Sequence, residues 1–542
     1  MESNPLKIRI PTPEVDERPT VYADRVGRWY ATLVSDDHKR RFGQYLTPVG
    51  VAMFMAMLFQ SGVRQQFRML DPGAGSGVLA CALLEVLAFR KERPSSIELV
   101  AYEIDPELAF CLEACLSYAN QWLAPFNIRL QFTIIKNDFV LDHAEVLEKT
   151  QRLFTEQTTG VNAFDVVIAN PPYFKIPKSD LRARAATAVV HGQPNLYALF
   201  MAVSAKLLKP QGEMIIITPR SYAAGPYFRR FREHFFAVMQ PESIHLFGSR
   251  RDAFNRDNIL QENVILHAKK IADTKEIRQN TMVQVSISAG ASDLTKVRQR
   301  MVPLTEILDL SSRDKMLQIP VDDVDDETCR AVRSWSGRLH AHGMEISTGP
   351  VVPFRAVSFL DHDGQSPGSH APLLWMQNVQ AMCVTWPTAA RGKPQYIKVS
   401  PKSMPLLVVD KNYILLRRFS AKEQARRLTA APLVAGALGS PWIGLENHVN
   451  YIHRPGGTLN QHEVYGLAAL LNSRLLDIYF RVFNGNTQVS ATELRALPLP
   501  PLDAIMEIGK RWLSMASTVE NIDALIEEVL DFIPPECMME AV

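Results

Sequence analysis

Four consecutive residues, Asn170, Pro171, Pro172 and Tyr173, are of the types that could prepare a ring amine for alkylation. They follow the apolar run 166–169, which is typical of a buried parallel strand. Neither proline can donate to a sheet, and each fixes its own φ, so the chain leaves the strand as a stiff elbow. A planar ring could stack on Tyr173 while its amino group donates to the Asn170 side-chain oxygen and the Pro171 carbonyl. Two such acceptors would localise the nitrogen lone pair where charge develops. The alternative is a plain strand-to-loop turn with a chance sequence.

A glycine-rich segment with an acidic start forms a second candidate site. Asp71 is followed by Gly73, Gly75 and Gly77, and then by an apolar stretch, 78–89, that favours a helix. Glycines let the backbone pass close to a ligand, and a helix N-terminus offers free N–H groups. The spacing is neither the dinucleotide fingerprint nor a phosphate-binding P-loop. An acidic residue at the strand end would repel phosphates, so the segment suits a cationic or amine-bearing ligand.

Acidic residues also stand at the ends of two further expected strands. Glu103 follows 97–102, a position that commonly binds ribose hydroxyls. Asp138 and Phe139 follow 130–135, where a carboxylate and a ring could hold an adenine by its amino group and its face.

The elements that position these residues alternate between strand and helix. Thr47 is a suitable N-cap and Pro48 a suitable first residue for a helix over 49–59. The remaining pattern predicts helices over 21–41, 194–208 and 226–239, and strands over 212–218, 243–247 and 262–268. This alternation predicts an α/β fold with a mostly parallel, doubly wound sheet.

Composition bounds the class of protein. The chain has 542 residues, 47% of them hydrophobic and 21% charged, and a net charge of +2, so any basic surface must be local. The six cysteines form no Cys-x-x-Cys pair and no zinc pattern with histidine, which indicates reduced thiols and no metal site. No apolar leader or membrane-length apolar run occurs. We therefore expect an intracellular protein that does not associate with membranes.

The pattern of residue types changes beyond residue 270. An acidic run at 321–327 favours a solvated linker, and short β-like runs become frequent after 331. Between Arg391 and Arg427 there are ten Lys or Arg residues against two acidic ones, with aromatic residues interleaved. Such a mixture suits a nucleic-acid surface, although a solvated face is the alternative. Helices are expected over 463–483 and 502–532.

Taken together, these motifs resemble the N6-adenine DNA methyltransferases of bacterial restriction–modification systems, in the group whose cofactor motifs come first and whose target-recognition domain comes last. Residues 43–48 resemble the N-terminal cofactor motif, and Asp71 to Gly77 the glycine loop. Glu103 matches the ribose-binding acid, Asp138 with Phe139 the adenine-binding pair, and Asn170 to Tyr173 the catalytic motif. Order and spacing agree over about 250 residues.

The resemblance implies a seven-stranded Rossmann-like sheet of the S-adenosylmethionine-dependent methyltransferase type and a mixed α/β C-terminal target-recognition domain. The expected domains are an arm and helix (1–42), the catalytic domain (43–270), a linker (271–330), the target-recognition domain (331–500) and a C-terminal helix (501–542). S-adenosylmethionine would contact Tyr45, Thr47, Pro48, Asp71, Gly73, Gly75, Gly77, Glu103, Asp138 and Phe139. A flipped-out adenine would lie between Tyr173 and Phe254, with Phe247 as the alternative, and Asn170 with Pro171 would hold its N6.

The resemblance also implies double-stranded DNA as the partner, a monomer in the bacterial cytoplasm, and a separately encoded restriction endonuclease. Three alternatives stay open at this point. The first is an RNA adenine methyltransferase, and the second is a protein-glutamine methyltransferase, which shares the Asn-Pro-Pro-Tyr motif. The third is a non-catalytic DNA-binding subunit that keeps the fold as a scaffold.

Overall fold

The computed structural model describes residues 9–44, 46–62, 64–148, 163–190, 194–248, 262–272, 281–291, 293–309, 315–363, 369–388, 392–420, 424–484, 488–514 and 518–532. The chain divides into two compact units, Met1–Ile319 and Pro320–Val542.

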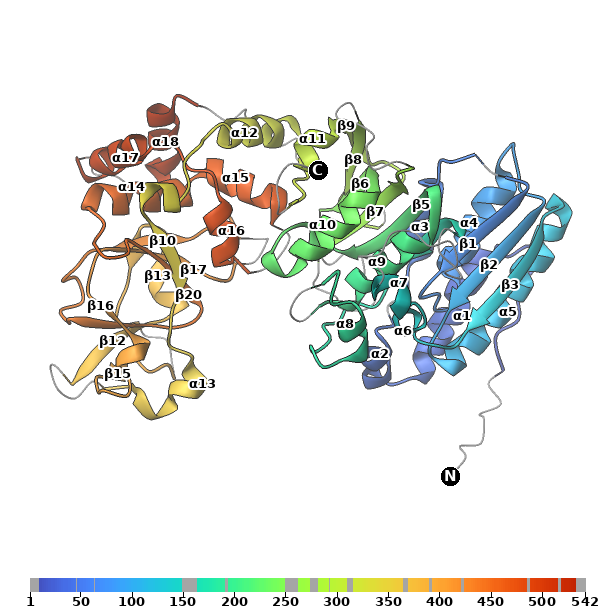
Figure 1. The fold of residues 1–542 in the computed structure, drawn as a ribbon, viewed down its shortest axis with the longest axis horizontal. Coiled ribbons are helices and arrows are strands. Elements are labelled where there is room, and N and C mark those ends of the chain that lie inside the picture. Colours follow the sequence, from blue (N-terminus) through green and yellow to red (C-terminus); the bar gives the residue numbers. More distant parts are fainter. Residues whose placement is uncertain are drawn as a thin grey trace. The chain divides into compact units, whose positions relative to one another are not determined.

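A nine-stranded sheet with the order β3-β2-β1-β4-β5-β7-β6-β8-β9 forms the centre of the first unit (Figure 1). Its strands are β1 (Gln66–Asp71), β2 (Ser96–Tyr102), β3 (Arg129–Ile135), β4 (Phe164–Ala169), β5 (Leu208–Pro219), β6 (Met239–Phe247), β7 (Asn263–Lys270), β8 (Met282–Ser288) and β9 (Arg298–Pro303). The strands from β3 to β5 pair in parallel, and β7 lies antiparallel between β5 and β6. The expected α/β fold with a mostly parallel, doubly wound sheet is confirmed.

The sheet has two strands more than expected, because part of the stretch 271–330 is not a linker. β8 pairs in parallel with β6, and β9 pairs antiparallel with β8. The acidic run after it is also structured. Asp322 caps helix α12 (Asp323–Arg333) by accepting from the N–H of Asp325 at 2.8 Å, and acidic side chains in a first turn complement the helix dipole.

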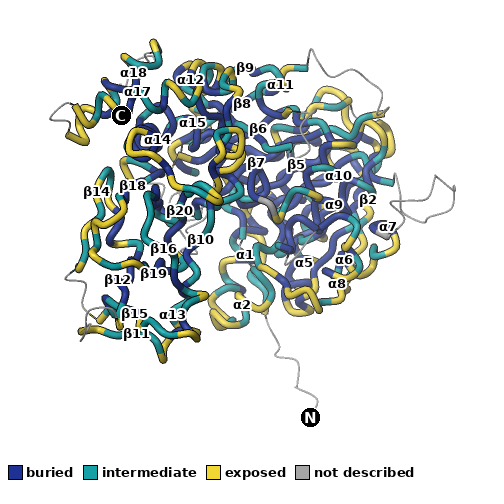
Figure 2. Tube along the Cα trace, turned by 60° about the vertical axis from the view of Figure 1, so that its left-hand side comes forward, coloured by how far each residue is buried: buried dark blue, intermediate teal, exposed yellow. Residues whose placement is uncertain are grey.

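Helices cover the strands of the first unit, and Figure 2 shows the central strands buried along most of their length. These helices are α1 (Pro19–Leu33), α2 (Asp36–Phe42), α3 (Val49–Met57), α4 (Val78–Phe89), α5 (Pro106–Leu123), α6 (Phe139–Asp142), α7 (Ala144–Glu148), α8 (Leu181–Ala185), α9 (Leu196–Leu207), α10 (Arg229–Val238) and α11 (Leu304–Ile307). The single helix expected over 21–41 is two, because Ser35 caps α2 by accepting from the N–H of His38.

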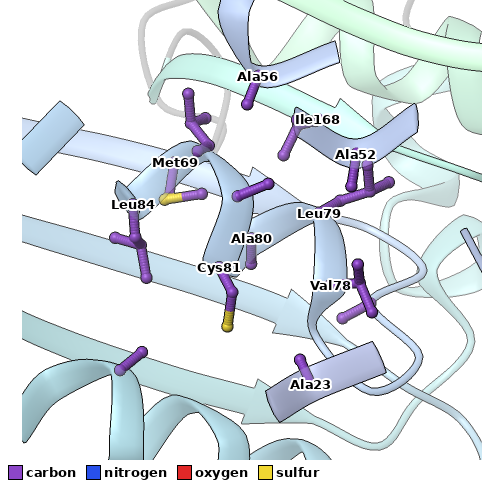
Figure 3. Close-up of a cluster of buried hydrophobic side chains, with 14 of the residues drawn as sticks. Ala23, Ala52, Ala56, Met69, Val78, Leu79, Ala80, Cys81, Leu84 and Ile168 are labelled. Carbon is purple, nitrogen blue, oxygen red and sulfur yellow. The ribbon is translucent and has the colours of Figure 1, made fainter. Parts of the chain in front are cut away.

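Small side chains let the helices approach the sheet and one another closely. Figure 3 shows Ala23 of α1, Ala52 of α3 and Ala80 of α4 in one buried cluster with Met69 of β1 and Ile168 of β4. Helix α4 packs against both α1 and α3. Since α4 begins directly after Gly77, this packing fixes the glycine-rich turn that precedes it.

Among its described residues the second unit contains three sheets, of which the largest two have the orders β11-β15-β12-β19-β16 and β10-β20-β17-β18, while β13 pairs with β14. Its strands are β10 (Glu345–Thr348), β11 (Leu360–Asp361), β12 (His370–Leu374), β13 (Val379–Gln380), β14 (Cys383–Val384), β15 (Tyr396–Lys398), β16 (Leu407–Val409), β17 (Tyr413–Arg417), β18 (Ala430–Leu433), β19 (Trp442–Leu445) and β20 (Val449–His453). Its other helices are α13 (Pro353–Ala356), α14 (Gln461–Asn472), α15 (Arg474–Phe483), α16 (Ala491–Ala496), α17 (Leu502–Ser514) and α18 (Ile522–Leu530).

Two of the expected C-terminal helices are each divided. Ser473 ends α14 and caps α15 by accepting from the N–H of Leu476 at 3.3 Å, so the helix expected over 463–483 turns at that residue. The helix expected over 502–532 is α17 and α18, and α17 packs against α14. Within the described ranges, no helix is both long and apolar enough to cross a bilayer.

Candidate active site

The acidic and polar residues singled out by the sequence meet at one edge of the first sheet. Asp71 is the last residue of β1, Glu103 directly follows β2, and Asn170 directly follows β4. Because β1 pairs in parallel with both β2 and β4, these three strand ends lie side by side. The strand order reverses direction at β1, and α/β sheets bind ligands in the crevice at such a switch point.

The side chain of Asn170 is held between two hydroxyl groups. Its Nδ2 donates to Thr47 Oγ1 at 3.1 Å, and its Oδ1 accepts from the hydroxyl of Tyr173 at 2.5 Å. The same hydroxyl lies 3.1 Å from the carbonyl oxygen of Ile217 on β5. Burial raises the pKa of Tyr173 well above its usual value, so the phenol keeps its hydrogen. The two prolines between these residues give the stiff connection that the sequence predicts.

Thr47 does not cap a helix. Helix α3 begins at Val49 with Pro48 in the capping position and no side-chain cap bond. The prediction of Thr47 as the N-cap, with Pro48 as the first helical residue, is therefore wrong. The Thr47 hydroxyl instead contacts the catalytic-motif amide, which lies 123 residues further along the chain.

The three glycines of the loop between β1 and α4 differ in what they require. Gly75 and Gly77 have φ of +56° and +89°, which favour glycine whatever the surrounding space. A Cβ on Gly77 would also lie 2.8 Å from Leu112 Cδ1. Gly73 has no such φ, and its Cβ would meet only ordinary contacts, 3.7 Å from the Phe200 ring and 3.8 Å from the carbonyl oxygen of Asn170. Neither the backbone conformation nor the packing around it therefore requires a glycine at Gly73.

Two buried carboxyl groups lie beside this loop. Burial raises the pKa of Asp71 to about 7 and that of Glu103 to about 7. The Glu103 oxygens accept from the N–H of Gly75 and of Asp105, each at 2.9 Å. Both oxygens of Asp71 are buried with no hydrogen bond of normal geometry among the described residues, although nearby amides partly favour its charged form. A cationic ligand at this edge would stabilise both carboxylates, so the residues present fit a sulfonium cofactor.

The side chains of Asp138 and Phe139 both make contacts within the fold. Asp138 Oδ1 caps α6 by accepting from the N–H of Val140 and of Leu141 at 3.0 Å, and its Oδ2 lies 3.4 Å from Arg182 Nη1. Phe139 is 2% exposed. Its ring packs against Tyr102, His143 and Phe200. In this structure Asp138 is half-buried beyond the end of β3, and the Phe139 ring belongs to the core behind it.

Two of the predicted site residues, Tyr45 and Phe254, lie outside the described residues. The alternative stacking residue, Phe247, is 1% exposed and packs edge-on against His245. Its ring therefore faces the core and offers no face to a base in this structure.

The sequence pattern assigned no functional role to Asp105, which several side chains hold at this edge of the sheet. Its Oδ2 accepts from Tyr30 Oη at 2.5 Å, from His38 Nε2 at 2.8 Å and from Gln44 Nε2 at 2.6 Å. Burial acts to raise the pKa of Asp105, but these bonds together hold it below its usual value. The only local signal is the Asp-Pro pair, which predicts a helix cap, and Asp105 does cap α5.

The basic stretch in the second unit is divided between core and surface. Arg427 is 1% exposed and donates to Ser420 Oγ and Asn484 Oδ1. Arg417 donates to the carbonyl of Val379. Lys398 and Lys402 are exposed. The expectation that the whole stretch is a binding surface is thus too broad, because the Arg427 side chain is part of the core.

The chain is similar to several known methyltransferases. A model of the Eco57I restriction-modification methylase family matches residues 102–254. The chain is 32% identical over 510 residues to the Type II methyltransferase M.PstI of Providencia stuartii, covering 94% of this chain and 97% of that protein. It is 32% identical over 509 residues to the Type II methyltransferase M.BsuBI of Bacillus subtilis, covering 91% and 95%. A tRNA1(Val) (adenine(37)-N6)-methyltransferase of Porphyromonas gingivalis is 31% identical over 153 residues, covering 28% of this chain and 49% of that protein.

The large, mostly parallel sheet is typical of the S-adenosylmethionine-dependent methyltransferase class. The likeness to M.PstI and M.BsuBI over nearly the whole chain narrows this class further. The chain belongs to the Type II restriction–modification DNA methyltransferases, in the adenine-specific family.

Proposed function

We propose that this enzyme transfers a methyl group from S-adenosylmethionine to N6 of an adenine that is flipped out of double-stranded DNA. The observation that carries the proposal is the Asn170 amide, which the chain fixes at the sheet edge next to the glycine loop. A Cβ added to Gly73 would lie 3.8 Å from the backbone carbonyl oxygen of Asn170, so the cofactor loop and the catalytic elbow are adjacent.

The residues would divide the work as follows. Asp71, Glu103 and the loop Gly73–Gly77 would hold the cofactor, whose sulfonium supplies an electrophilic methyl group when bound. Asn170 Oδ1 and the Pro171 carbonyl would accept from the two N6 hydrogens and orient the lone pair toward that methyl group. The ring of Tyr173 would stack on the base, which must leave the helix to reach the site. Positioning of this kind supplies much of the rate.

The second unit would read the DNA sequence. Its exposed lysines, Lys398 and Lys402, would contact phosphates, and loops between its short strands would reach base edges. A cognate restriction endonuclease would be a separate protein, and the methyltransferase would act as a monomer in the bacterial cytoplasm, where its DNA lies.

The same motif leaves an RNA substrate as the second candidate, which the partial likeness to a tRNA adenine methyltransferase favours. That likeness covers 28% of the chain, whereas the Type II methyltransferases match both units. A protein-glutamine substrate has no such support, and the intact Asn170 and Tyr173 disfavour a non-catalytic subunit.

The test begins by sequencing modified bases in DNA from cells that express the protein, which gives the methylated site. Single-turnover methylation is then measured on a duplex containing that site and on RNA of the same sequence. We expect transfer to the duplex alone, and Asn170→Ala to bind cofactor and duplex normally yet react about 10²–10³ times more slowly. Near wild-type single-turnover rates for Asn170→Ala would overturn the mechanism, and preferential methylation of the RNA would overturn the substrate.

A further inference from the structure

The loop between α2 and α3 contacts Asp105, the glycine loop and the catalytic elbow. We call residues 43–48 the bridging loop, of which Tyr45 lies outside the described residues. Its Gln44 donates to Asp105 at 2.6 Å, beside Glu103. A Cβ on Gly75 would lie 3.5 Å from Leu46 Cδ2, so the bridging loop also touches the glycine loop.

The bridging loop also lies directly on the catalytic elbow at two points. Gly43 has φ of +64°, and its added Cβ would lie 2.6 Å from Pro172 Cβ and 3.1 Å from the Phe174 ring, so no other residue fits there without displacement. At the other end of the loop, Thr47 Oγ1 accepts from Asn170 Nδ2 at 3.1 Å. The Thr47 side chain is 5% exposed, so water does not readily replace it in this bond.

The direction of this bond matters for chemistry because the two ends of an amide are opposite in kind. An acceptor for the base amine must be Oδ1, since Nδ2 carries only hydrogens. With Nδ2 bound to Thr47, Oδ1 is turned to the side of Tyr173. Without the Thr47 oxygen, Nδ2 of the half-buried Asn170 would lose an acceptor, and amide orientations that turn Oδ1 away from the base would become populated.

We infer that Thr47 is a positioning residue for the catalytic amide, acting through Asn170 Nδ2, and is not chiefly a ligand of the cofactor. The inference rests on the proposed role of Asn170. It assigns to the bridging loop a task in the chemical step, in addition to any contact that the loop makes with S-adenosylmethionine. A small misplacement of a reacting group can cost up to about 100-fold in rate, and we expect an effect of about 10–100-fold.

The test compares Thr47→Val, which keeps the side-chain shape but removes the hydroxyl, with Thr47→Ser, which keeps the hydroxyl. The matched control is Thr20→Val, a buried threonine on α1 whose hydroxyl lies 3.9 Å from Met53 Sδ. For each variant we would measure the melting temperature, the S-adenosylmethionine Kd by calorimetry, and the single-turnover rate on an unmethylated duplex that contains the enzyme's site. We expect Thr47→Val to react about 10–100 times more slowly with a cofactor Kd within about threefold of wild type. Thr47→Ser should recover most of that loss, and Thr20→Val should leave the rate unchanged.

A double-mutant cycle with Asn170→Ala completes the test, because residues that act through one another are not additive. In the Asn170→Ala background, Thr47→Val should cause little further loss. A cofactor Kd raised in proportion to the fall in rate, or equal losses in both backgrounds, would overturn the inference while leaving the proposed function standing. A fast Asn170→Ala enzyme would instead overturn the proposed function and this inference with it.

Discussion

The hydroxyl oxygen of Tyr173 lies 2.5 Å from Asn170 Oδ1, the atom that we propose as the acceptor for the adenine amine. A carbonyl oxygen has two lone pairs, so the phenol and the base could bind it together, but each weakens it for the other. The ring and the hydroxyl of Tyr173 thus have separable effects, one on stacking and one on the acceptor.

Replacing Tyr173 separates those effects. Tyr173→Phe keeps the ring and removes a competing donor, so we expect a single-turnover rate within a few-fold of wild type. Tyr173→Ala removes a stacking interaction of about 1–3 kcal/mol and should lose most of the activity. Single-turnover rates on an unmethylated duplex that contains the enzyme's site, with melting temperatures as the control for folding, would check this. Equal losses for the two variants would show that the hydroxyl, and not the ring, is what the reaction needs.

The glycine loop permits a comparison between a glycine set by the fold and one left for a ligand. The added Cβ of Gly73→Ala meets only atoms at 3.7 Å or more, so the melting temperature of this variant should stay close to wild type. Its S-adenosylmethionine affinity should fall at least tenfold, because the Cβ would occupy space that we propose for the cofactor. Gly77→Ala must adopt φ of +89°, which costs about 1–2 kcal/mol for a residue with a Cβ, and it meets Leu112 as well. It should melt at a lower temperature. Calorimetry that finds unchanged cofactor affinity in Gly73→Ala would contradict a close approach there.

Cofactor binding should strengthen as the pH rises from about 6 to about 8. Burial raises the pKa of Glu103 to about 7, so below that pH the folded enzyme holds a proton that a cationic ligand must displace. The contribution of Glu103 to the affinity should change by up to about tenfold per pH unit below pH 7 and level off above it, and Asp71, whose pKa is also raised to about 7, adds a change of the same sign. The linked effect on the unliganded fold has the opposite sign. The unfolded chain loses this proton at the ordinary pKa, so stability falls as the pH rises from about 4.5 to about 7.

The control for this titration is Glu103→Gln, which cannot ionise. The α-amino group of the cofactor titrates near pH 8 in both proteins, so the difference between the two profiles isolates the contribution of Glu103. Calorimetry in buffers of different ionisation enthalpy would count the protons released on binding. The same pH profile in both proteins would show that Glu103 is not the group responsible.

Basic residues of the second unit should fall into two functional groups. Lys398→Gln and Lys402→Gln should weaken binding to every DNA sequence and lower the salt dependence by about one unit of slope for each phosphate that is no longer neutralised. Arg427→Met should instead lower the melting temperature, because buried hydrogen bonds to a charged group contribute about 1.5–3 kcal/mol each. Filter binding at several salt concentrations and thermal melts would separate the groups. A stable Arg427→Met protein with a reduced salt slope would reverse the assignment.

The division of the chain at Ile319 predicts separable activities. A fragment of residues 1–319 keeps the whole nine-stranded sheet and the site, so it should bind S-adenosylmethionine. Without the second unit it should lose selective methylation of the enzyme's site. Sequencing of modified bases after incubation with plasmid DNA would check this. Methylation of the same site with unchanged selectivity would place sequence recognition in the first unit.

The sequence by itself determined the parallel strands that carry the site and the edge of the sheet at which it lies. Apolar runs that alternate with helical stretches predict parallel strands, and parallel strands must end at one edge, so Asp71, Glu103 and Asn170 had to come together. The stiffness of the elbow was equally local, because two prolines fix φ wherever they occur. None of these conclusions depends on which distant side chain meets which.

Tertiary structure alone decided the contacts that orient the site. Thr47 and Asn170 are 123 residues apart, and Asp105 meets Gln44 across 61. A threonine before a proline has the local pattern of a helix cap, and only the packing of the bridging loop on the elbow gives its hydroxyl another partner. In the same way, Arg427 within a basic stretch is a core residue because distant segments cover it. Local composition specifies charge, but burial is set by neighbours that the local sequence does not contain.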